Sequence, residues 1–581
     1  MKIFLSSLNA RFIHSALSLY YLRSFCQVLS HDFTIKEYTI NENLLDIAGD
    51  IHREKAEMIG FSCYIWNIEP TLKLCSILKK IEPKIFIVLG GPEVSYDPEE
   101  ILKNNSFIDC VVVGEGEETF YQLVERKAQD LSLEGLSGVV FRKDRQIMRN
   151  PHRPLISKLD QITFPYSTYD LINFSGKIIY YESSRGCPFN CQYCLSSTIH
   201  GVRYFSMERV QDDLEKIILS GVKQVKFVDR TFNCHQSRTK ELLSFLLKFK
   251  ERKINFHFEI AADLLDEEMI DLMGQAPAGY FQVEIGVQST NLQVLKEIQR
   301  KMDFFQVGEA VNRLREKGNV HLHLDLIAGL PKEDMMSFEK SFNEVYDLKP
   351  DNLQLGFLKL LKGSGLRAKA EQYGLVFQDQ PPYEILATNV MTFDELVELK
   401  KIEDIIEQYH NSGKYKHALI YGINCWGKGP FSFFRGLAGF WQEKSKERML
   451  SSDGKTKLLF QYLRKILPEQ DEKLFFDLLK LDWLSSEPRN TIPDWLGGDR
   501  RQDRTINLAE YLPWARGMTP KEVYKKAAVE RFHYFFIVEN GIIIDIKKEE
   551  SKAIIDYSQD SAGKKKPIIM FTNIRNSATF G

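Results

Sequence analysis

The chain has 581 residues, 44% of them hydrophobic and 27% charged, which is an ordinary globular composition and implies about three or four domains. Its 77 basic and 79 acidic residues leave a net charge of −2, so the overall charge gives no reason to expect a nucleic-acid or membrane-surface partner. No apolar run reaches about 18 residues, the amino terminus lacks a signal-peptide pattern, and the nine cysteines form no disulfide framework, so we expect a cytoplasmic protein without a membrane span.

Strand-like and helix-like segments alternate through residues 1–140, which is the pattern of an α/β domain. The expected strands are 2–7, 33–38, 57–64, 84–89 and 110–113, and the expected helices are 16–30, 70–81 and 117–127. Apolar strands separated by helices predict a doubly wound parallel sheet, whose ligand lies across the carboxyl ends of the strands.

Small and polar residues follow these strands. Glycine at a strand-to-helix turn lets backbone amides approach a ligand closely, although each glycine taken singly is better explained by a tight turn. No G-x-G-x-x-G follows the first strand, which disfavours a dinucleotide site. The residues expected to bind a cofactor at this edge are Asn9, Ser62, Gly90, Gly91, Glu93, Gly114, Glu115 and Gly116.

Residues 141–172 predict a linker. They contain Pro151, Pro154 and Pro165 and have little periodicity, and a hairpin-like stretch lies around 138–148. Such a segment is typical of the connection between two compact units.

Strand–helix alternation resumes in residues 173–375. Six strands are expected at 177–182, 224–229, 254–261, 280–286, 321–326 and 352–357, with helices between them. This pattern predicts a partial (β/α)6 barrel with its active residues at the carboxyl ends of the strands. Polar residues expected there are Asp229, Glu259, Glu284 and Gln288, each of which is explained equally well by a structural interaction inside the barrel.

Three cysteines, Cys187, Cys191 and Cys194, follow the first barrel strand within eight residues. Three thiolates at this spacing can bind three corners of a cubane iron–sulfur cluster and leave one iron open. A zinc site would need a fourth ligand, and the one nearby candidate, His200, fits no zinc spacing. The other six cysteines are scattered singly, which disfavours a chance grouping of structural cysteines.

The segment Arg185-Gly-Cys-Pro-Phe-Asn-Cys-Gln-Tyr-Cys194 resembles the signature of the radical S-adenosylmethionine (SAM) superfamily. Leu89-Gly-Gly-Pro-Glu93 and Val113-Gly-Glu-Gly-Glu117 resemble the cobalamin-binding domain that precedes the barrel in many of its members. The resemblance implies a [4Fe–4S] cluster on the three cysteines and cobalamin at the amino-terminal sheet edge. The D-x-H-x-x-G motif of histidine-ligated cobalamin proteins is absent, so axial ligation of cobalt by His14 is not expected.

The same resemblance implies that SAM binds at the barrel mouth. Asp229 would accept from its amino group and Glu259 would bind its ribose hydroxyls. Glu284 and Gln288 would add polar contacts at the rim of the same site.

Residues 376–581 first follow helical periodicity, at 394–409, 431–448, 455–467 and 472–480. Strand patterns follow at 533–538, 541–547 and 567–571, with a hairpin signal at Asn540-Gly541. This α+β extension resembles the domain of unknown function 4080, found on a subgroup of the cobalamin-binding radical SAM enzymes, and its motifs indicate no chemistry.

The resemblance implies a cobalamin-dependent radical SAM methyltransferase that acts on an unactivated carbon through a 5′-deoxyadenosyl radical and methylcobalamin. An alternative is a cobalamin-dependent rearrangement or oxidative cyclisation. A methylthiotransferase acting on transfer RNA is a second alternative, but Cys26, Cys63, Cys75 and Cys110 are too widely spaced for its second cluster. The expected partners are a small-molecule or peptide substrate, which the sequence does not name, and a reductant such as flavodoxin or ferredoxin.

Overall fold

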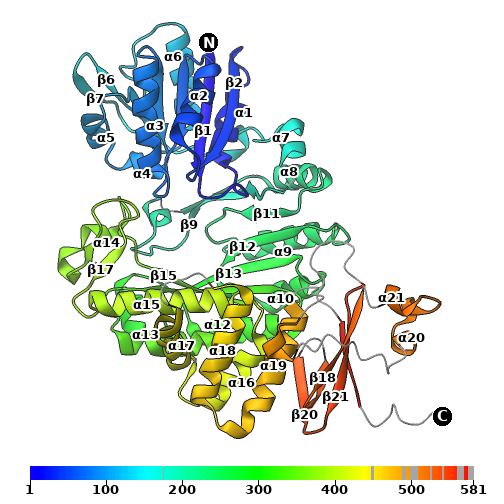
Figure 1. Ribbon diagram of the computed structural model, residues 1–581. Coiled ribbons are helices and arrows are strands. Elements are labelled where there is room, and N and C mark those ends of the chain that lie inside the picture. Colours follow the sequence, from blue (N-terminus) through cyan, green and yellow to red (C-terminus); the bar gives the residue numbers. More distant parts are fainter. Residues whose placement is uncertain are drawn as a thin grey trace. The chain divides into compact units, whose positions relative to one another are not determined.

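Figure 1 shows the chain as a computed structural model. It divides into two units. One unit comprises Met1–Pro350 with Leu355–Leu396, and the other comprises Asp351–Gln354 with Val397–Gly581. The residues that the structure describes are 1–174, 176–199, 201–445, 450–486, 492–497, 508–523, 526–539, 542–558 and 568–573.

A seven-stranded sheet organises the amino-terminal part of the first unit, in the order β2-β1-β3-β4-β5-β6-β7. Five strands run parallel: β1 (Lys2–Asn9), β2 (Asp32–Thr39), β3 (Met58–Ser62), β4 (Phe86–Gly90) and β5 (Cys110–Val112). Every residue of β3 is buried, as expected of a strand covered by helices on both faces.

Alternate residues of β1 point into two separate cores, one on each face of the sheet. Phe4 packs with α2 (Leu44–Arg53) and α3 (Ile68–Ile81), whereas Ile3 packs with residues of α1 (Leu17–Phe25) and α6 (Glu117–Ala128). The doubly wound sheet predicted from the sequence is therefore confirmed.

Two details of this domain differ from the sequence-based expectation. Helix α2 was not predicted, although Asn43 caps its first turn by accepting from the amide of Leu45. The hairpin of β6 (Val139–Lys143) and β7 (Gln146–Arg149) adds antiparallel strands to the sheet edge beside β5. It therefore belongs to the amino-terminal sheet and not to the linker in which the prediction placed most of it.

The predicted partial barrel is confirmed as a six-stranded sheet with the order β15-β14-β13-β12-β11-β8. Its strands are β8 (Ile179–Tyr181), β11 (Gln224–Phe227), β12 (Asn255–Ile260), β13 (Phe281–Gln288), β14 (His321–Ala328) and β15 (Asn352–Phe357). The helices between them are α8 (Met207–Leu219), α9 (Gln236–Leu247), α10 (Glu267–Gly274), α11 (Leu292–Glu297), α12 (Phe304–Lys317) and α13 (Met335–Asp347). Strand register places Glu259, Glu284 and His323 side by side across β12, β13 and β14.

The chain after β15 stays in the first unit as far as Leu396. It forms α14 (Gly365–Ala368) and a short ribbon of β16 (Val376–Phe377) and β17 (Ile385–Ala387). The predicted domain boundary at residue 375 therefore lies inside this unit.

The second unit is α+β, as predicted. Its helices are α15 (Phe393–Ile405, the first residues of which lie in the first unit), α16 (Lys416–Trp426), α17 (Pro430–Ser445), α18 (Ser452–Ile466) and α19 (Glu472–Ser486). Its strands form a sheet of β18 (Ala527–Phe532), β21 (Ser551–Asp556) and β22 (Ile568–Asn573) and a hairpin of β19 (Phe535–Glu539) and β20 (Ile542–Lys547). The turn residues Asn540 and Gly541 lie outside the described residues.

Helix α16 and strands β18 and β21 were not predicted. Gly422 lies inside α16, where glycine weakens the helical signal of the sequence. A side chain at this position would meet Leu463 of α18 at 2.7 Å, so the glycine permits close packing of the two helices. No helix in the described part of the chain is long and apolar enough to cross a membrane.

Candidate functional site

The three clustered cysteines lie on a hairpin that the sequence did not predict. Strand β9 (Ser184–Cys187) ends at the first of them and pairs antiparallel with β10 (Gly201–Tyr204). Gly186 has a φ of 102°, and a Cβ atom there would lie 2.1 Å from the carbonyl oxygen of Gly201. Only glycine therefore lets the two strands approach at this point, directly before Cys187.

The three thiols open onto one cavity of about 230 Å³ at the barrel mouth. The cavity is also lined by three residues predicted for SAM, namely Glu259 at the end of β12 and Glu284 and Gln288 on β13. Gln288 has a φ of 72°, which is unusual for a residue other than glycine. Six residues that the sequence analysis named as site residues therefore line one cavity.

The donor set of this cavity fits an iron–sulfur cluster better than a single ion. Within the described ranges, no three histidine, cysteine or acidic side chains converge as a single metal ion requires. The three thiols are instead distributed around one cavity, as binding to three corners of a cubane requires. His200, the candidate fourth ligand for zinc, lies outside the described residues.

Two cavity residues that the sequence analysis missed contact the thiols. The guanidinium group of Arg300 donates to the sulfur of Cys191 at 3.6 Å and to the hydroxyl of Tyr193 at 3.1 Å. The hydroxyl of Thr231 lies 3.5 Å from the sulfur of Cys187. Burial raises the pKa of Cys191, and the charge and hydrogen bond of Arg300 oppose that rise, so Arg300 favours the thiolate.

Charged side chains surround the carboxylates of the cavity. Lys226 on β11 lies 3.0 Å from a carboxylate oxygen of Glu284 and 4.0 Å from one of Glu259. Burial raises the pKa of Glu259 to about 7. The pKa of Glu284 is lowered to about 2, because its interaction with His257, whose Nε2 lies 3.1 Å from a carboxylate oxygen, and the charge of Lys226 outweigh the effect of burial. The two neighbouring carboxyls therefore differ in protonation near neutral pH.

Asp229 is placed differently from the expectation. It is buried and is not among the residues that line the cavity. Its carboxylate accepts from the amide of Ser183 at 2.8 Å and from the hydroxyls of Ser183 and Ser184 at 2.7 and 2.6 Å. These bonds fix the chain where it enters the cysteine hairpin, so this geometry does not support the predicted contact between Asp229 and a ligand ammonium group.

Hydrogen bonds join the loops at the edge of the amino-terminal sheet where the sequence predicted a bound cofactor. The amide of Cys63 donates to the carbonyl of Gly90 at 2.7 Å, and the hydroxyl of Ser95 donates to the carbonyl of Gly91 at 2.8 Å. The amide of Gly114 lies 3.5 Å from that same hydroxyl. The loops after β3, β4 and β5 therefore meet at the carboxyl ends of the strands, where the sequence predicted a ligand.

The polar side chains of this edge already have protein partners. The amide nitrogen of Asn9 donates to the carbonyl of His14 at 3.1 Å, and the hydroxyl of Ser62 lies 3.0 Å from that of Ser18. Glu93 is 3% exposed and accepts from the hydroxyl of Tyr383. The backbone of the glycines is thus better placed to contact a cofactor directly than these three side chains.

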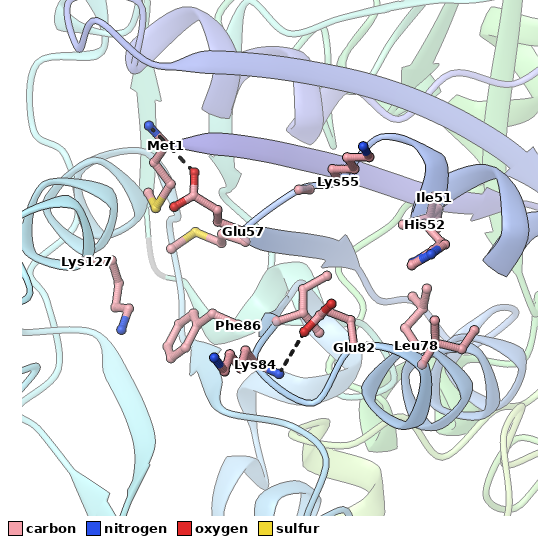
Figure 2. A pocket seen from close by; sticks show the side chains of 14 residues that line it. Met1, Ile51, His52, Lys55, Glu57, Leu78, Glu82, Lys84, Phe86 and Lys127 are labelled. Atoms are coloured by element: carbon pink, nitrogen blue, oxygen red, sulfur yellow. Dashed lines mark hydrogen bonds and ion pairs between the residues drawn. The ribbon is translucent and has the colours of Figure 1, made fainter.

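A second cavity lies at the opposite edge of the amino-terminal sheet (Figure 2). It has a volume of about 670 Å³ and is lined by residues at the starts of β1, β3 and β4 and at the ends of α2, α3 and α6, including Met1, His52, Ile81, Phe86 and Lys127. Parallel sheets of this type bind ligands at the carboxyl ends of their strands, so its size does not make this cavity the cofactor site.

The four cysteines of the amino-terminal sheet domain are buried in its two cores. Cys63 and Cys75 lie in one core, and Cys26 and Cys110 lie in the other. Burial raises the pKa of Cys26 to about 12 and raises those of the other three as well. Structural thiols on opposite faces of a sheet cannot form the second cluster of a methylthiotransferase.

Comparison with family models matches three consecutive parts of the chain. The B12 binding domain matches residues 7–124, the radical SAM superfamily matches residues 181–345, and a protein family of unknown function, DUF4080, matches residues 371–555. The first two matches contain the sheet edge and the cysteine hairpin, respectively.

Several curated proteins are similar to the chain. An uncharacterized methyltransferase of Pyrococcus horikoshii, PH0819, is 29% identical over 53% of the chain and 68% of its own length. The cobalamin-dependent radical SAM methyltransferase TokK of Streptomyces tokunonensis is 25% identical over 66% of the chain and 61% of its own length. The anaerobic magnesium-protoporphyrin IX monomethyl ester cyclase of Rubrivivax gelatinosus is 23% identical over 79% of the chain and 80% of its own length.

A solved structure has the same fold over most of the chain. The radical SAM methyltransferase TsrM from Kitasatospora setae, with tryptophan substrate and a SAM analogue bound, superposes with a TM-score of 0.56. The match covers 66% of this chain and 80% of TsrM at 16% identity. This likeness shows the fold, and the family matches show that the chain is a radical SAM enzyme with an amino-terminal B12-binding domain and a carboxyl-terminal DUF4080 domain.

Proposed function

We propose that the chain is a cobalamin-dependent methyltransferase that uses SAM to act on an unactivated carbon. The observation that carries this proposal is the shared cavity, in which three thiols face the carboxylates and amide of Glu259, Glu284 and Gln288. The similarity to PH0819 and TokK supports methyl transfer as the outcome.

Two bound groups would supply the chemistry that side chains lack: an iron–sulfur cluster for reductive cleavage of SAM, and cobalamin as carrier of the methyl group. The cysteines would hold the cluster, and the glycine-rich loops that contain Gly90, Gly91, Gly114 and Gly116 would hold cobalamin. Glu259, Glu284 and Gln288 would orient SAM by accepting from its polar groups. The substrate is a small molecule or peptide, and a cytoplasmic flavodoxin or ferredoxin would supply the electron.

Product analysis tests the proposal. The protein is reconstituted without oxygen and incubated with hydroxocobalamin, SAM and a low-potential reductant, and the nucleoside products are quantified. We expect both 5′-deoxyadenosine and S-adenosylhomocysteine, since the first reports radical cleavage and the second reports methyl transfer. Absence of both products from protein with a full cluster would contradict the proposal.

Oxidative cyclisation is the second candidate, because the cyclase of Rubrivivax gelatinosus aligns with 79% of the chain. A cyclase needs radical cleavage of SAM but transfers no methyl group. Formation of 5′-deoxyadenosine without S-adenosylhomocysteine would favour this candidate over methyl transfer.

The position of Arg300 predicts an effect on the cluster. A hydrogen bond from a charged donor is worth about 1.5 to 3 kcal/mol, which corresponds to about 60 to 130 mV for a one-electron couple. Arg300→Gln removes a positive charge beside Cys191, so the reduction potential should become more negative by about 60 to 130 mV. Redox titration followed by electron paramagnetic resonance measures the shift, and an unchanged or more positive potential would contradict this role.

The raised pKa of Glu259 predicts a pH-dependent affinity for SAM. Its charged neighbours are Arg230, Glu284, Lys226 and Asp325, and burial leaves its pKa at about 7. A cationic ligand favours the ionised carboxylate, so SAM should bind about tenfold more tightly at about pH 8 than at about pH 6. Anaerobic equilibrium dialysis measures this ratio, and Glu259→Gln should bring it close to one. An affinity that falls as pH rises would contradict the assignment.

A further inference from the structure

Two arginines face each other on the hairpin that carries Cys187. Arg185 on β9 and Arg203 on β10 are direct register partners. Like charges placed opposite each other on paired strands repel, and an isolated two-stranded ribbon is at best marginally stable in water. The position of the hairpin therefore depends on groups that neutralise this pair.

The neutralising carboxylates include one from the loop after β5, Glu115, and one at the start of α6, Glu117, both in the B12-binding domain. Glu115 accepts from Arg203 at 2.7 and 3.1 Å and from Arg185 at 3.3 Å. Glu117 accepts from Arg185 at 2.5 Å, and Glu182 accepts from the same guanidinium at 2.7 and 2.8 Å. Three carboxylates thus contact two guanidinium groups. The four hydrogen bonds made by Glu115 and Glu117 join residues that are 68 to 88 positions apart in the sequence.

These groups are largely removed from water. The side chains of Glu115 and Arg185 are each 13% exposed, that of Glu117 is 7% exposed and that of Arg203 is 19% exposed. The charge of Arg185 and the hydrogen bond from Arg203 lower the pKa of Glu115 despite its burial. Removal of one partner from such a buried network leaves an uncompensated charge, which is far more costly than loss of a surface ion pair.

We propose that Glu115, together with Glu117, is a positioning residue that fastens the cysteine hairpin to the corrin-binding edge and couples the two cofactor sites. Glu115 lies between Gly114 and Gly116, whose backbone is expected to approach cobalamin. Its partner Arg185 lies two residues before Cys187. A ligand that restrains the loop after β5 therefore restrains the hairpin as well, and binding at one site favours binding at the other.

The positioning part is tested without any cofactor. Hydrogen–deuterium exchange of the unloaded full chain is compared for the wild type, Glu115→Gln and the control Glu134→Gln, whose carboxylate makes an exposed ion pair with Lys143. We expect amides of β9 and β10 to exchange about tenfold faster in Glu115→Gln and to be unaffected in Glu134→Gln. Unchanged exchange in Glu115→Gln, or an equal change in the control, would overturn the positioning role.

The coupling part rests on the proposed function and has its own readout. The affinity for SAM is measured on reconstituted protein with and without hydroxocobalamin. We expect cobalamin to tighten SAM binding in the wild type by about fivefold or more, and this ratio to fall close to one in Glu115→Gln. An equal ratio in the two proteins would overturn the coupling. A wild type that binds no cobalamin would instead count against the proposed function, while the exchange measurement still decides the positioning role.

A double-mutant cycle identifies the partner. If Glu115 acts through Arg203, Glu115→Gln combined with Arg203→Gln should accelerate exchange in the hairpin no more than the more severe single variant does. Additive effects of the two substitutions would show that the residues act independently and would overturn the assignment of Arg203 as partner.

Discussion

Alanine at any one of Cys187, Cys191 and Cys194 is expected to abolish formation of 5′-deoxyadenosine. The three thiols line one cavity, and a cubane that has lost one of them would have a second exposed iron. Changes to groups that merely support metal ligands cost about 10- to 100-fold in affinity or activity, so loss of a ligand should lower the rate by more than about 100-fold. Iron and sulfide content, electron paramagnetic resonance of the reduced protein and chromatography of the nucleoside measure the effect.

Cys234 provides a demanding control for this experiment. It follows β11, and its sulfur lies 3.3 Å from the hydroxyl of Tyr204 on β10. Burial raises the pKa of Cys234, and the nearby Cys187 adds to that rise. It does not line the cavity. Cys234→Ala should therefore retain a full cluster and nearly normal activity. A loss as large as that of the three other variants would mean that the thiols holding the cluster have been wrongly assigned.

The sequence predicted the parallel strands of the two large sheets and the role of the clustered cysteines as one site, because both signals are local. Buried parallel strands form apolar runs, and the cysteines fall within eight residues. The contacts that complete the site join distant residues: Arg300 lies 109 positions from Cys191, and Glu115 lies 70 from Arg185. No periodicity encodes such pairs, so Arg300 was missed and Glu115 was expected to contact only the cofactor.

Asp229 is a residue that the sequence analysis assigned to the ligand because its contacts with distant residues could not be predicted. Its place after a barrel strand matched the expected position of a ligand-binding carboxylate. The sequence does not reveal that the hydroxyls of Ser183 and Ser184, 46 and 45 residues earlier, already bind it. Position in a fold thus predicts which residues lie near a site, whereas their hydrogen-bond partners decide which of them remain free for a ligand.

Gly91→Ala is expected to prevent cobalamin binding. Gly91 has a φ of 106°, and a Cβ atom there would lie 2.5 Å from the carbonyl oxygen and 3.0 Å from the nitrogen of Cys63. Both neighbours are backbone atoms held by hydrogen bonds to Gly90 and Glu93, so they cannot move aside independently. The substitution should force apart the loops after β3 and β4, in addition to about 1 to 3 kcal/mol of backbone strain. We expect bound cobalamin, measured by absorbance after gel filtration, to fall by more than about tenfold.

Gly135→Ala is the control that separates this steric clash from the loss of stability expected whenever a glycine with a positive φ is replaced by alanine. Gly135 has a φ of 74° in the same domain, but nothing lies within 4 Å of the position of its Cβ atom. Its substitution should cost only about 1 to 2 kcal/mol of stability and leave cobalamin binding intact. Thermal denaturation of both variants compares the two costs. Of these two glycines, only Gly91 lies where the loops after β3 and β4 meet. Equal cobalamin content in Gly91→Ala and Gly135→Ala would therefore contradict the expectation that close approach of those loops forms the corrin site.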